Sequence, residues 1–223
     1  MGVGIGLKFG LIKSLLSAVQ ILQVVFLFFI LVLMWVVYGF INTIIKKDGT
    51  GLKGSKVNKI NIQYYKTSYA EFILGAFNDK LCMLDYRYRT KRESIDKRLC
   101  TALDAEFIEK DSDVLVQTRK ELDEYLRGER RIFNISLLML GSEFQRSVWE
   151  ALLKIPYGKT ATYLELSKIV GNVKAVRAVA NANGANAISI IIPCHRVIGT
   201  NGRLTGYAGG LPLKKKLLEL ETI

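Results

Sequence analysis

The longest hydrophobic segment of the chain lies near its N-terminus. No charged residue occurs between Lys13 and Lys46, and residues 21–41 are almost wholly apolar. A helix of this length spans roughly 30 Å, the thickness of a bilayer core. The first interpretation is a transmembrane helix, with the lysine-rich residues 46–59 on the cytoplasmic side. A buried core helix and a leader that is not native to the folded protein are the alternatives.

The middle of the chain combines short strand patterns with one amphipathic helix. The strand segments are rich in aromatic and β-branched residues, and Asn78-Asp79 between two of them indicates a hairpin. The helix places Leu122 and Tyr125 on its apolar side, and Gly128 ends it. The three strands and the helix are predicted at residues 60–65, 70–77, 80–88 and 114–127.

Two other features of this segment are interpreted as structural. A run of basic residues is expected to form a solvated edge; it comprises Arg87, Arg89, Lys91 and Arg92. Cys82 lies within a strand pattern and is expected to be a small buried hydrophobic residue. The chain has three cysteines without a Cys-x-x-Cys spacing and a single histidine, so we expect neither a disulfide scaffold nor a metal site.

The C-terminal part begins with three helical patterns. Ser142 with Gln145 forms one capping box and Thr162 with Glu165 forms another, and each opens a helix. A third helix, 174–183, follows Gly171-Asn172 directly, and its many alanines permit close approach to a DNA groove or simply favour a helix. Two short helices joined by a tight turn predict a helix-turn-helix unit.

A continuous apolar run over 187–192 predicts a buried strand that ends at Pro193. The next residues, Cys194 and the only histidine of the chain, His195, would then project from a turn at the sheet edge. A nearby base or cation lowers the pKa of a cysteine and favours its reactive thiolate. An inert buried cysteine beside a structural histidine is the alternative.

The last segment is a glycine-rich loop followed by a helix. Five glycines fall within residues 199–210, where a backbone of low bulk can line a flat ligand or form an ordinary turn region. Pro212 opens a helix that runs to about Glu221. Lys214, Lys215 and Lys216 lie in its first turn, where they would contact a phosphate or, more simply, form a solvated face.

Composition and charge narrow the class of protein. Half of the 223 residues are apolar and 23% are charged, which excludes a globally disordered chain. The net charge of +12 is uneven, because residues 58–141 carry 15 basic and 14 acidic side chains while residues 142–223 carry 11 and 5. A basic globular segment is typical of a nucleic-acid partner, and a solvated lysine-rich face is the alternative that charge alone leaves open.

Residues 142–221 resemble the catalytic domain of the O6-alkylguanine-DNA alkyltransferases, the methylated-DNA–protein-cysteine methyltransferases. The motifs that carry the resemblance are Phe144-Gln145 with Val148-Trp149, Ile155-Pro156-Tyr157-Gly158, Lys174-Ala175-Val176-Arg177-Ala178-Val179, Ile192-Pro193-Cys194-His195-Arg196-Val197, Gly206-Tyr207-Ala208-Gly209-Gly210 and Leu217-Leu218-Glu219-Leu220-Glu221. Pro-Cys-His-Arg in this setting is far more specific than a lone Cys-His pair. The resemblance implies an α/β (α+β) fold in which a ribonuclease-H-like N-terminal domain, 58–135, precedes a helix-turn-helix catalytic domain, 136–223. The apolar leader and linker, 1–57, are outside the usual family plan.

The resemblance also implies roles for single residues. Cys194 would accept the alkyl group, His195 would take its proton through a water, and Glu221 would orient His195. Asn186 would tie the end of the buried run to the helix-turn-helix, and Tyr163 would help to flip the nucleotide and protonate the departing guanine. The remaining implied contacts are Arg177, Ala175 and Ala178 with DNA, and Tyr207, Ala208 and Val197 with the guanine.

The implied activity is stoichiometric, irreversible alkyl transfer from O6-alkylguanine, and from O4-alkylthymine, in double-stranded DNA. The reaction needs no cofactor, and we expect a monomer whose catalytic domain lies in the reducing cytoplasm, anchored there if 21–41 spans the membrane. Two other hypotheses remain at this stage. A DNA-binding or lesion-sensing module would use the same helix-turn-helix without chemistry, and a cysteine hydrolase would turn over many times.

Overall fold

The computed structural model describes residues 26, 30–38 and 57–222. Residues 26 and 30–38 are helical. The rest of the predicted membrane helix, 21–41, lies outside the described residues. Within the described ranges, no helix is long and apolar enough to cross a bilayer.

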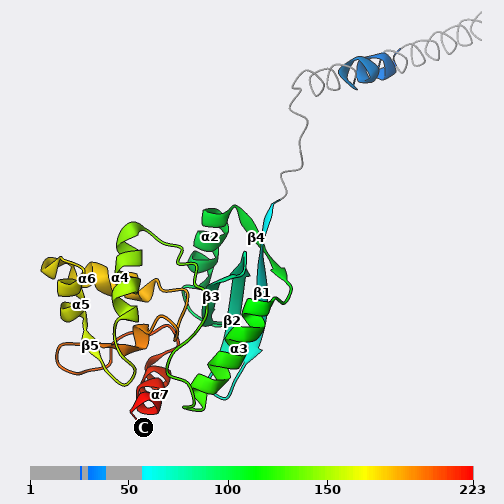
Figure 1. The fold of residues 1–223 in the computed structure, drawn as a ribbon. Coiled ribbons are helices and arrows are strands. Elements are labelled where there is room, and N and C mark those ends of the chain that lie inside the picture. The colour runs from blue at the N-terminus through cyan, green and yellow to red at the C-terminus, as the bar shows by residue number, and fades with distance from the viewer. Residues whose placement is uncertain (1–25, 27–29, 39–56, 223) are drawn as a thin grey trace, which may run out of the picture. The chain divides into compact units, whose positions relative to one another are not determined.

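The compact unit Val57–Ile223 begins with a four-stranded sheet (Figure 1). Its strand order is β3-β2-β1-β4, with β1 antiparallel to β2 and parallel to β4. Asn78 and Asp79 form the predicted hairpin turn at φ values of 47° and 58°, a left-handed region that these two residue types tolerate. The strands are β1 (Asn58–Lys66), β2 (Glu71–Phe77), β3 (Lys80–Tyr86) and β4 (Ala105–Glu109).

Two helices, α2 (Arg92–Leu103) and α3 (Asp113–Leu126), cover the opposite faces of this sheet. Successive strand residues point to opposite faces, so neighbours join different clusters. Phe72 packs in the cluster that contains the buried residues of α3, whereas Ile73 packs in the cluster that contains those of α2. The cluster on the α3 side continues into the C-terminal half, and one core therefore joins the two halves of the unit.

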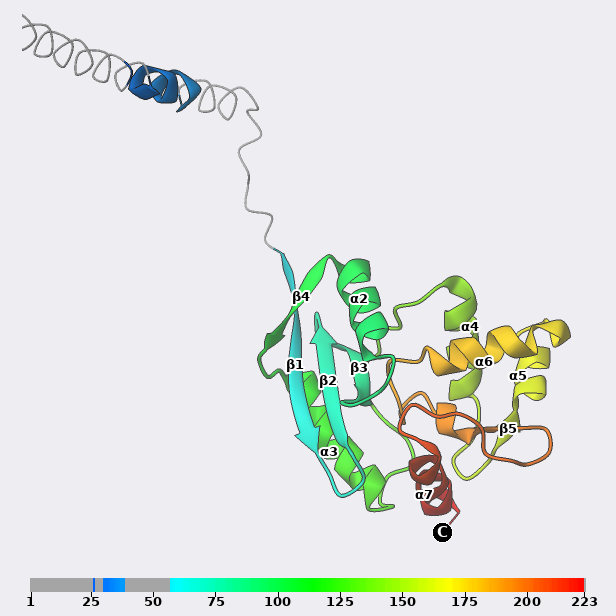
Figure 2. The same ribbon diagram turned by 180° about the vertical axis from the view of Figure 1, so that it is seen from behind.

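Three helices, α4 (Glu143–Leu153), α5 (Tyr163–Ile169) and α6 (Val176–Gly184), pack together in the C-terminal half, as Figure 2 shows from behind. Both predicted capping boxes are present, at the starts of α4 and α5. The Trp149 indole donates to the carbonyl of Ala182 over 2.8 Å and ties α4 to α6. The pair α5 and α6 confirms the predicted helix-turn-helix pattern.

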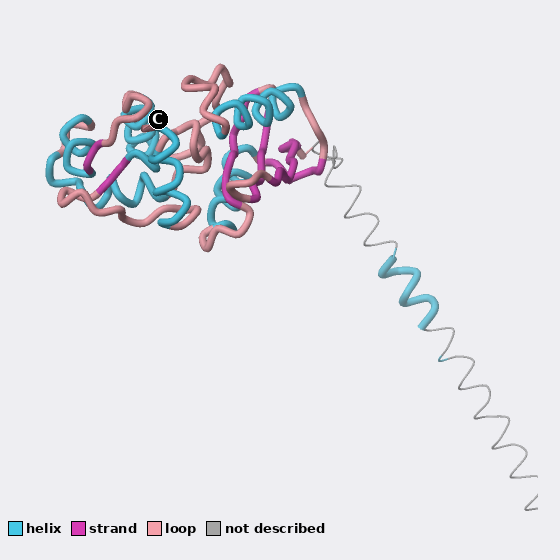
Figure 3. Tube along the Cα trace, turned by 90° about the horizontal axis from the view of Figure 1, so that it is seen from below, coloured by secondary structure: helices cyan, strands magenta, loops and turns pink. Residues whose placement is uncertain are grey.

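The remaining elements of the C-terminal half are short, apart from its last helix (Figure 3). Strand β5 (Ala161–Thr162) pairs in parallel with β6 (Val197–Ile198). The last helix has Pro212 in its first turn, as the sequence predicts. The short elements and the last helix are η1 (Val173–Ala175), η2 (Cys194–Arg196) and α7 (Leu211–Glu221).

The predicted strand over 187–192 is wrong, although the segment is buried. It folds as consecutive turns with a single bridge, between Ile188 and Leu84 of β3. Ile190 adopts a φ of 70°, which no strand accommodates. The apolar residues are buried because the segment lies between the sheet and the helices, so burial here does not report strand structure.

Candidate active site

Cys194 opens the short helix η2, immediately after Pro193. Its side chain is 4% exposed, and burial raises the pKa of the thiol. The resting side chain is therefore a thiol, and the thiolate favoured by the sequence is not its resting form. A reaction at this sulfur requires that a neighbouring group remove the proton as the bond forms.

Asn186 organises the turn that carries the sulfur. Its Nδ2 lies 3.3 Å from Sγ of Cys194 and also donates to the carbonyl of Ile192 over 3.0 Å. Its Oδ1 accepts from the backbone N–H of Ile188 over 2.9 Å. The hydrogen bond from the Asn186 amide to the sulfur lowers the pKa of Cys194 and so offsets part of the effect of burial. Asn186 thus connects the end of α6, through these turns, with the cysteine.

His195 is fully buried beside Glu221. Its Nε2 lies 2.9 Å from Oε1 of Glu221, and its Nδ1 has no hydrogen-bond partner among the described residues. Burial lowers the pKa of His195, although the bond to Glu221 opposes this effect. A neutral imidazole that donates from Nε2 keeps Nδ1 as a free acceptor for a proton.

Glu221 accepts several hydrogen bonds at once. Arg196 donates from Nε to Oε2 over 2.9 Å, and the N–H of Gly158 donates to Oε2 over 3.2 Å. The hydroxyl of Tyr125, from the last turn of α3, donates to Oε1 over 2.6 Å. Burial raises the pKa of Glu221, but these donors together with His195 outweigh it and hold the pKa at about 2. The carboxylate therefore stays charged next to the imidazole.

The close contact between residue 158 and the end of α7 requires a glycine. Its φ is +71°, and a Cβ at this position would lie 2.7 Å from the carbonyl oxygen of Glu221. A larger residue would push the end of α7 away and separate the Glu221 carboxylate from its donors.

Of the residues expected to contact the base, Tyr207 and Val197 lie next to His195. The Tyr207 ring packs edge-on against the His195 ring with centroids 6.3 Å apart, and its hydroxyl lies 2.6 Å from that of Tyr86. Val197 is buried directly after η2. Ala208 lines an open groove of about 620 Å³ that Tyr86 also lines. Tyr163 accepts a hydrogen bond from Thr205, and no hydrogen bond within the described part of the chain joins it to Cys194.

The residues expected to contact DNA lie apart from the sulfur, at the start of α6. Arg177 and Ala178 are exposed, and Ala175 at the end of η1 is half-buried. Of the three residues, Arg177 carries the only charge and the two alanines are small.

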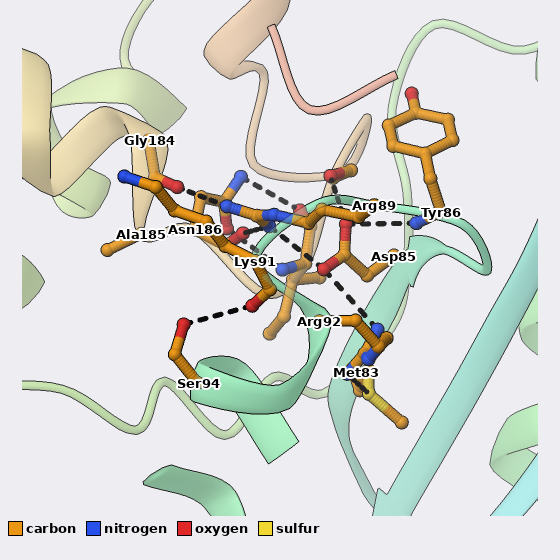
Figure 4. A network of polar contacts seen from close by, with 12 residues as sticks. Met83, Asp85, Tyr86, Arg89, Lys91, Arg92, Ser94, Gly184, Ala185 and Asn186 are labelled. Carbon is orange, nitrogen blue, oxygen red and sulfur yellow. Dashed lines mark hydrogen bonds and ion pairs between the residues drawn. The ribbon is translucent and has the colours of Figure 1, made fainter. Parts of the chain in front are cut away.

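The basic run expected to be a solvated edge includes a buried ion pair. Arg89 is 7% exposed and its Nη1 lies 2.8 Å from Oδ2 of Asp85, which is fully buried. The same guanidinium donates to the carbonyls of Asn186, over 2.8 Å, and Gly184. Arg98 of α2 donates to Ala185. Arg89, which Figure 4 shows, and Arg98 thus bond the carbonyls at the end of α6, where the helix dipole is negative.

Lys214 is buried rather than part of a solvated face. Its ammonium donates to the carbonyls of Val197 and Thr205, the latter over 3.1 Å, and burial lowers its pKa to about 8. Lys214 therefore joins α7 to the segment after η2. Lys215 and Lys216, its neighbours, are exposed. No group of residues that could hold a metal ion occurs in the described ranges.

Sequence reasoning assigned no site role to Tyr125, Asp85 or Arg89. Two signals were present. Asp85 is a charged residue inside an apolar strand pattern, and buried charges require partners. Tyr125 places a hydroxyl on the apolar face of a helix, where a buried hydroxyl requires an acceptor. Neither signal names the partner, because both partners are distant in the sequence.

Comparisons with known proteins agree with this arrangement. The family model described as the DNA-binding domain of 6-O-methylguanine DNA methyltransferase matches residues 143–223, and the model of its ribonuclease-like domain matches residues 60–139. A methylated-DNA–protein-cysteine methyltransferase of Methanosarcina acetivorans is 55% identical over 105 residues, which are 47% of this chain and 67% of that protein. The chain belongs to this family.

Solved structures of methyltransferases in the family share its architecture. A crystal structure of Mycobacterium tuberculosis O6-methylguanine methyltransferase has a TM-score of 0.63 and 36% identity, covering 73% of this chain and 93% of that chain. A mycobacterial structure in complex with DNA gives a TM-score of 0.63 and 36% identity, covering 74% and 92%. The expected α/β fold, a ribonuclease-like domain followed by a helical DNA-binding domain, is confirmed. The expected apolar N-terminal helix is not.

Proposed function

We propose that this methylated-DNA–protein-cysteine methyltransferase repairs DNA by transferring the alkyl group of O6-alkylguanine, and of O4-alkylthymine, irreversibly to Sγ of Cys194. One observation supports this most strongly. The sulfur is held by Asn186, and the neighbouring imidazole is anchored to Glu221 at one nitrogen and open at the other. This arrangement suits a thiol that must lose its proton only during reaction.

The proposed reaction is a nucleophilic displacement at the alkyl carbon. The Cys194 proton passes through a water to Nδ1 of His195, a bond forms between Sγ and the alkyl carbon, and the carbon–O6 bond breaks. The electron pair leaves with the guanine, which takes a proton from the Tyr163 hydroxyl. Glu221 stabilises the imidazolium that forms, as the carboxylate of a catalytic triad does. The thioether product has no route back to a thiol, so each molecule acts once.

The exposed surface of α6 would bring DNA to this centre. The small side chains of Ala175 and Ala178 would let the helix enter a groove closely. The target base must leave the stack, which costs a few kcal/mol, and Arg177 would fill the vacated space. Tyr207, Ala208 and Val197 would then line the base pocket. Binding should weaken with salt, since the basic C-terminal half would contact phosphates.

The experiment is a reaction with duplex DNA that contains one O6-methylguanine and is present in excess over protein. The guanine restored per protein molecule is counted by nucleoside chromatography. We expect restoration to stop at one equivalent. A lesion-sensing module would restore none, and a hydrolytic enzyme would continue past one equivalent; either result would reject the proposal.

The cellular setting is also a proposal. The chemistry needs a reduced thiol, so we place the catalytic domain in the cytoplasm. We also propose a monomer, because every residue in the proposed mechanism comes from one chain. Attachment to a membrane through 21–41 rests on the hydrophobicity of that segment alone. Fractionation of cells that express the full chain and a chain starting at Val57 tests it, with membrane recovery of the full chain alone as the result in its favour.

A further inference from the structure

Tyr125 brings the sheet half of the molecule into the active site. It lies in the last turn of α3 and is fully buried. Its hydroxyl donates to Oε1 of Glu221 over 2.6 Å, the same oxygen that lies 2.9 Å from Nε2 of His195. The hydroxyl is itself 3.4 Å from that nitrogen. The Arg196 guanidinium also donates to Oε1, from Nη2 over 2.9 Å and from Nε over 3.2 Å, so donors from both halves of the molecule share this carboxylate oxygen.

The ring of Tyr125 does not need this hydroxyl to pack. The ring lies against Phe133 and Tyr157, with centroid distances of 5.4 and 6.2 Å, and a phenylalanine would make the same ring contacts. Of the buried residues near it on α3, Leu122 and Leu126 are apolar, whereas Glu121, one turn earlier, is charged. The hydroxyl thus adds a specific bond to Glu221 that the packing of the ring does not require.

We propose that Tyr125 is a positioning residue for alkyl transfer, which shares Oε1 of Glu221 with His195 and so limits the basicity of the imidazole. This rests on the proposed function. A carboxylate without the Tyr125 donor at Oε1 would hold the proton on the ring more strongly and favour the imidazolium. An imidazolium has no free acceptor at Nδ1, and it cannot take the proton of Cys194.

The hydrogen bond from Tyr125 to Glu221 is one of the contacts that set the basicity of His195. Burial lowers the pKa of His195 and Glu221 raises it, so the balance depends on how much negative charge the carboxylate offers to the ring. Gly158 donates to Oε2 and Arg196 donates to both oxygens, whereas Tyr125 donates to Oε1 alone. The other titratable or charged groups near the pair are Arg196, Lys214, Tyr157 and Tyr207.

The chain offers a direct test because His195 is its only histidine. The ring nitrogens of the ¹⁵N-labelled full chain give one imidazole signal set, and their shifts against pH report the pKa of His195 without DNA. In Tyr125→Phe we expect the midpoint to move up by about 0.5 pH unit or more, since the carboxylate loses a competing donor. Tyr157→Phe is the matched control, because that hydroxyl bonds only the carbonyl of Leu220 in the described chain; its midpoint should not move.

Methyl transfer provides the second readout. The acid limb of the rate against pH should move up by the same amount in Tyr125→Phe, giving about threefold slower transfer at a pH below both midpoints. An unchanged imidazole midpoint in folded Tyr125→Phe would overturn the proposal, whatever happens to the rate. Thermal unfolding checks the fold, and Tyr125→Met, which also lacks the hydroxyl, replaces the phenylalanine variant if that one does not fold. If the wild-type chain transfers no methyl group while Tyr125→Phe still shifts the midpoint of His195, the proposed function is rejected, and only the effect of Tyr125 on the basicity of His195 is retained.

Discussion

Cys82 and Cys194 are both buried, with exposures of 1% and 4%, but their surroundings differ. Cys82 lies in β3 and has one polar contact, to the carbonyl of Gly75, and burial raises its pKa to about 12. Cys194 lies in a turn and has the Asn186 amide, with the Glu221-bound His195 next in the chain. Burial therefore does not separate an inert thiol from a reactive one. The polar groups within reach of each sulfur do.

Replacing each of the two cysteines with alanine in turn gives the largest expected difference. Cys194→Ala should abolish restoration of guanine, because the acceptor atom is gone. Cys82→Ala should restore one equivalent and lower the free energy of unfolding by only about 1 kcal/mol. Nucleoside chromatography of the DNA measures the first quantity and urea unfolding the second. Activity retained in Cys194→Ala would remove the distinction between the two cysteines.

The ion pair beside Asn186 gives the next largest effect. Arg89→Met leaves Asp85 buried with only Arg92, at 3.4 Å, as a cationic partner, and should lower the free energy of unfolding by about 3–5 kcal/mol. Asp85→Asn with Arg89→Met removes both charges and should recover part of the loss. Urea unfolding of the single and the double variant measures the free energy of unfolding of each. Equal losses in the single and the double variant would show that the pair is not coupled.

The imidazole is what Cys82 lacks. His195→Gln keeps a donor for Glu221 but removes the proton acceptor, and we expect methyl transfer to slow by about 100-fold. Single-turnover rates measure this loss. Iodoacetamide labelling of Cys100, which is far from His195 in the sequence and belongs to the sheet half, serves as the internal control and should not change. A rate equal to that of wild type would place the base elsewhere.

The smallest expected effect concerns access rather than chemistry. Arg177→Ala should slow repair of duplex DNA by about tenfold while transfer from the free alkylated base stays unchanged, because only the duplex requires a vacated stack to be filled. Lys120→Ala, which removes an exposed charge from the sheet half, is the matched control. Equal losses on duplex and free base in Arg177→Ala would argue against this role.

The sequence predicted the elements whose signals are local. Both capping boxes, the Asn78-Asp79 hairpin and the helix that starts at Pro212 depend on residues within a few positions of each other. It missed α2 and β4, and it interpreted 187–192 as a strand, because an apolar run indicates burial without indicating backbone conformation.

The site divides in the same way. Cys194, His195 and Glu221 could be named from motifs, and the structure brings His195 and Glu221 into contact. The bonds of Tyr125 to Glu221 and of Arg89 to Asn186 link residues that are 96 and 97 positions apart. No local pattern contains such pairings, and only the packing of the two halves creates them.

The decisive measurement is a peptide map of the protein after reaction with duplex DNA that contains O6-methylguanine. Mass spectrometry assigns any added methyl group to the peptide of Cys82, Cys100 or Cys194. We predict one methyl group per molecule, on the Cys194 peptide alone, in step with the guanine restored. A methyl group on another peptide, or restored guanine with an unmodified Cys194, would contradict the mechanism.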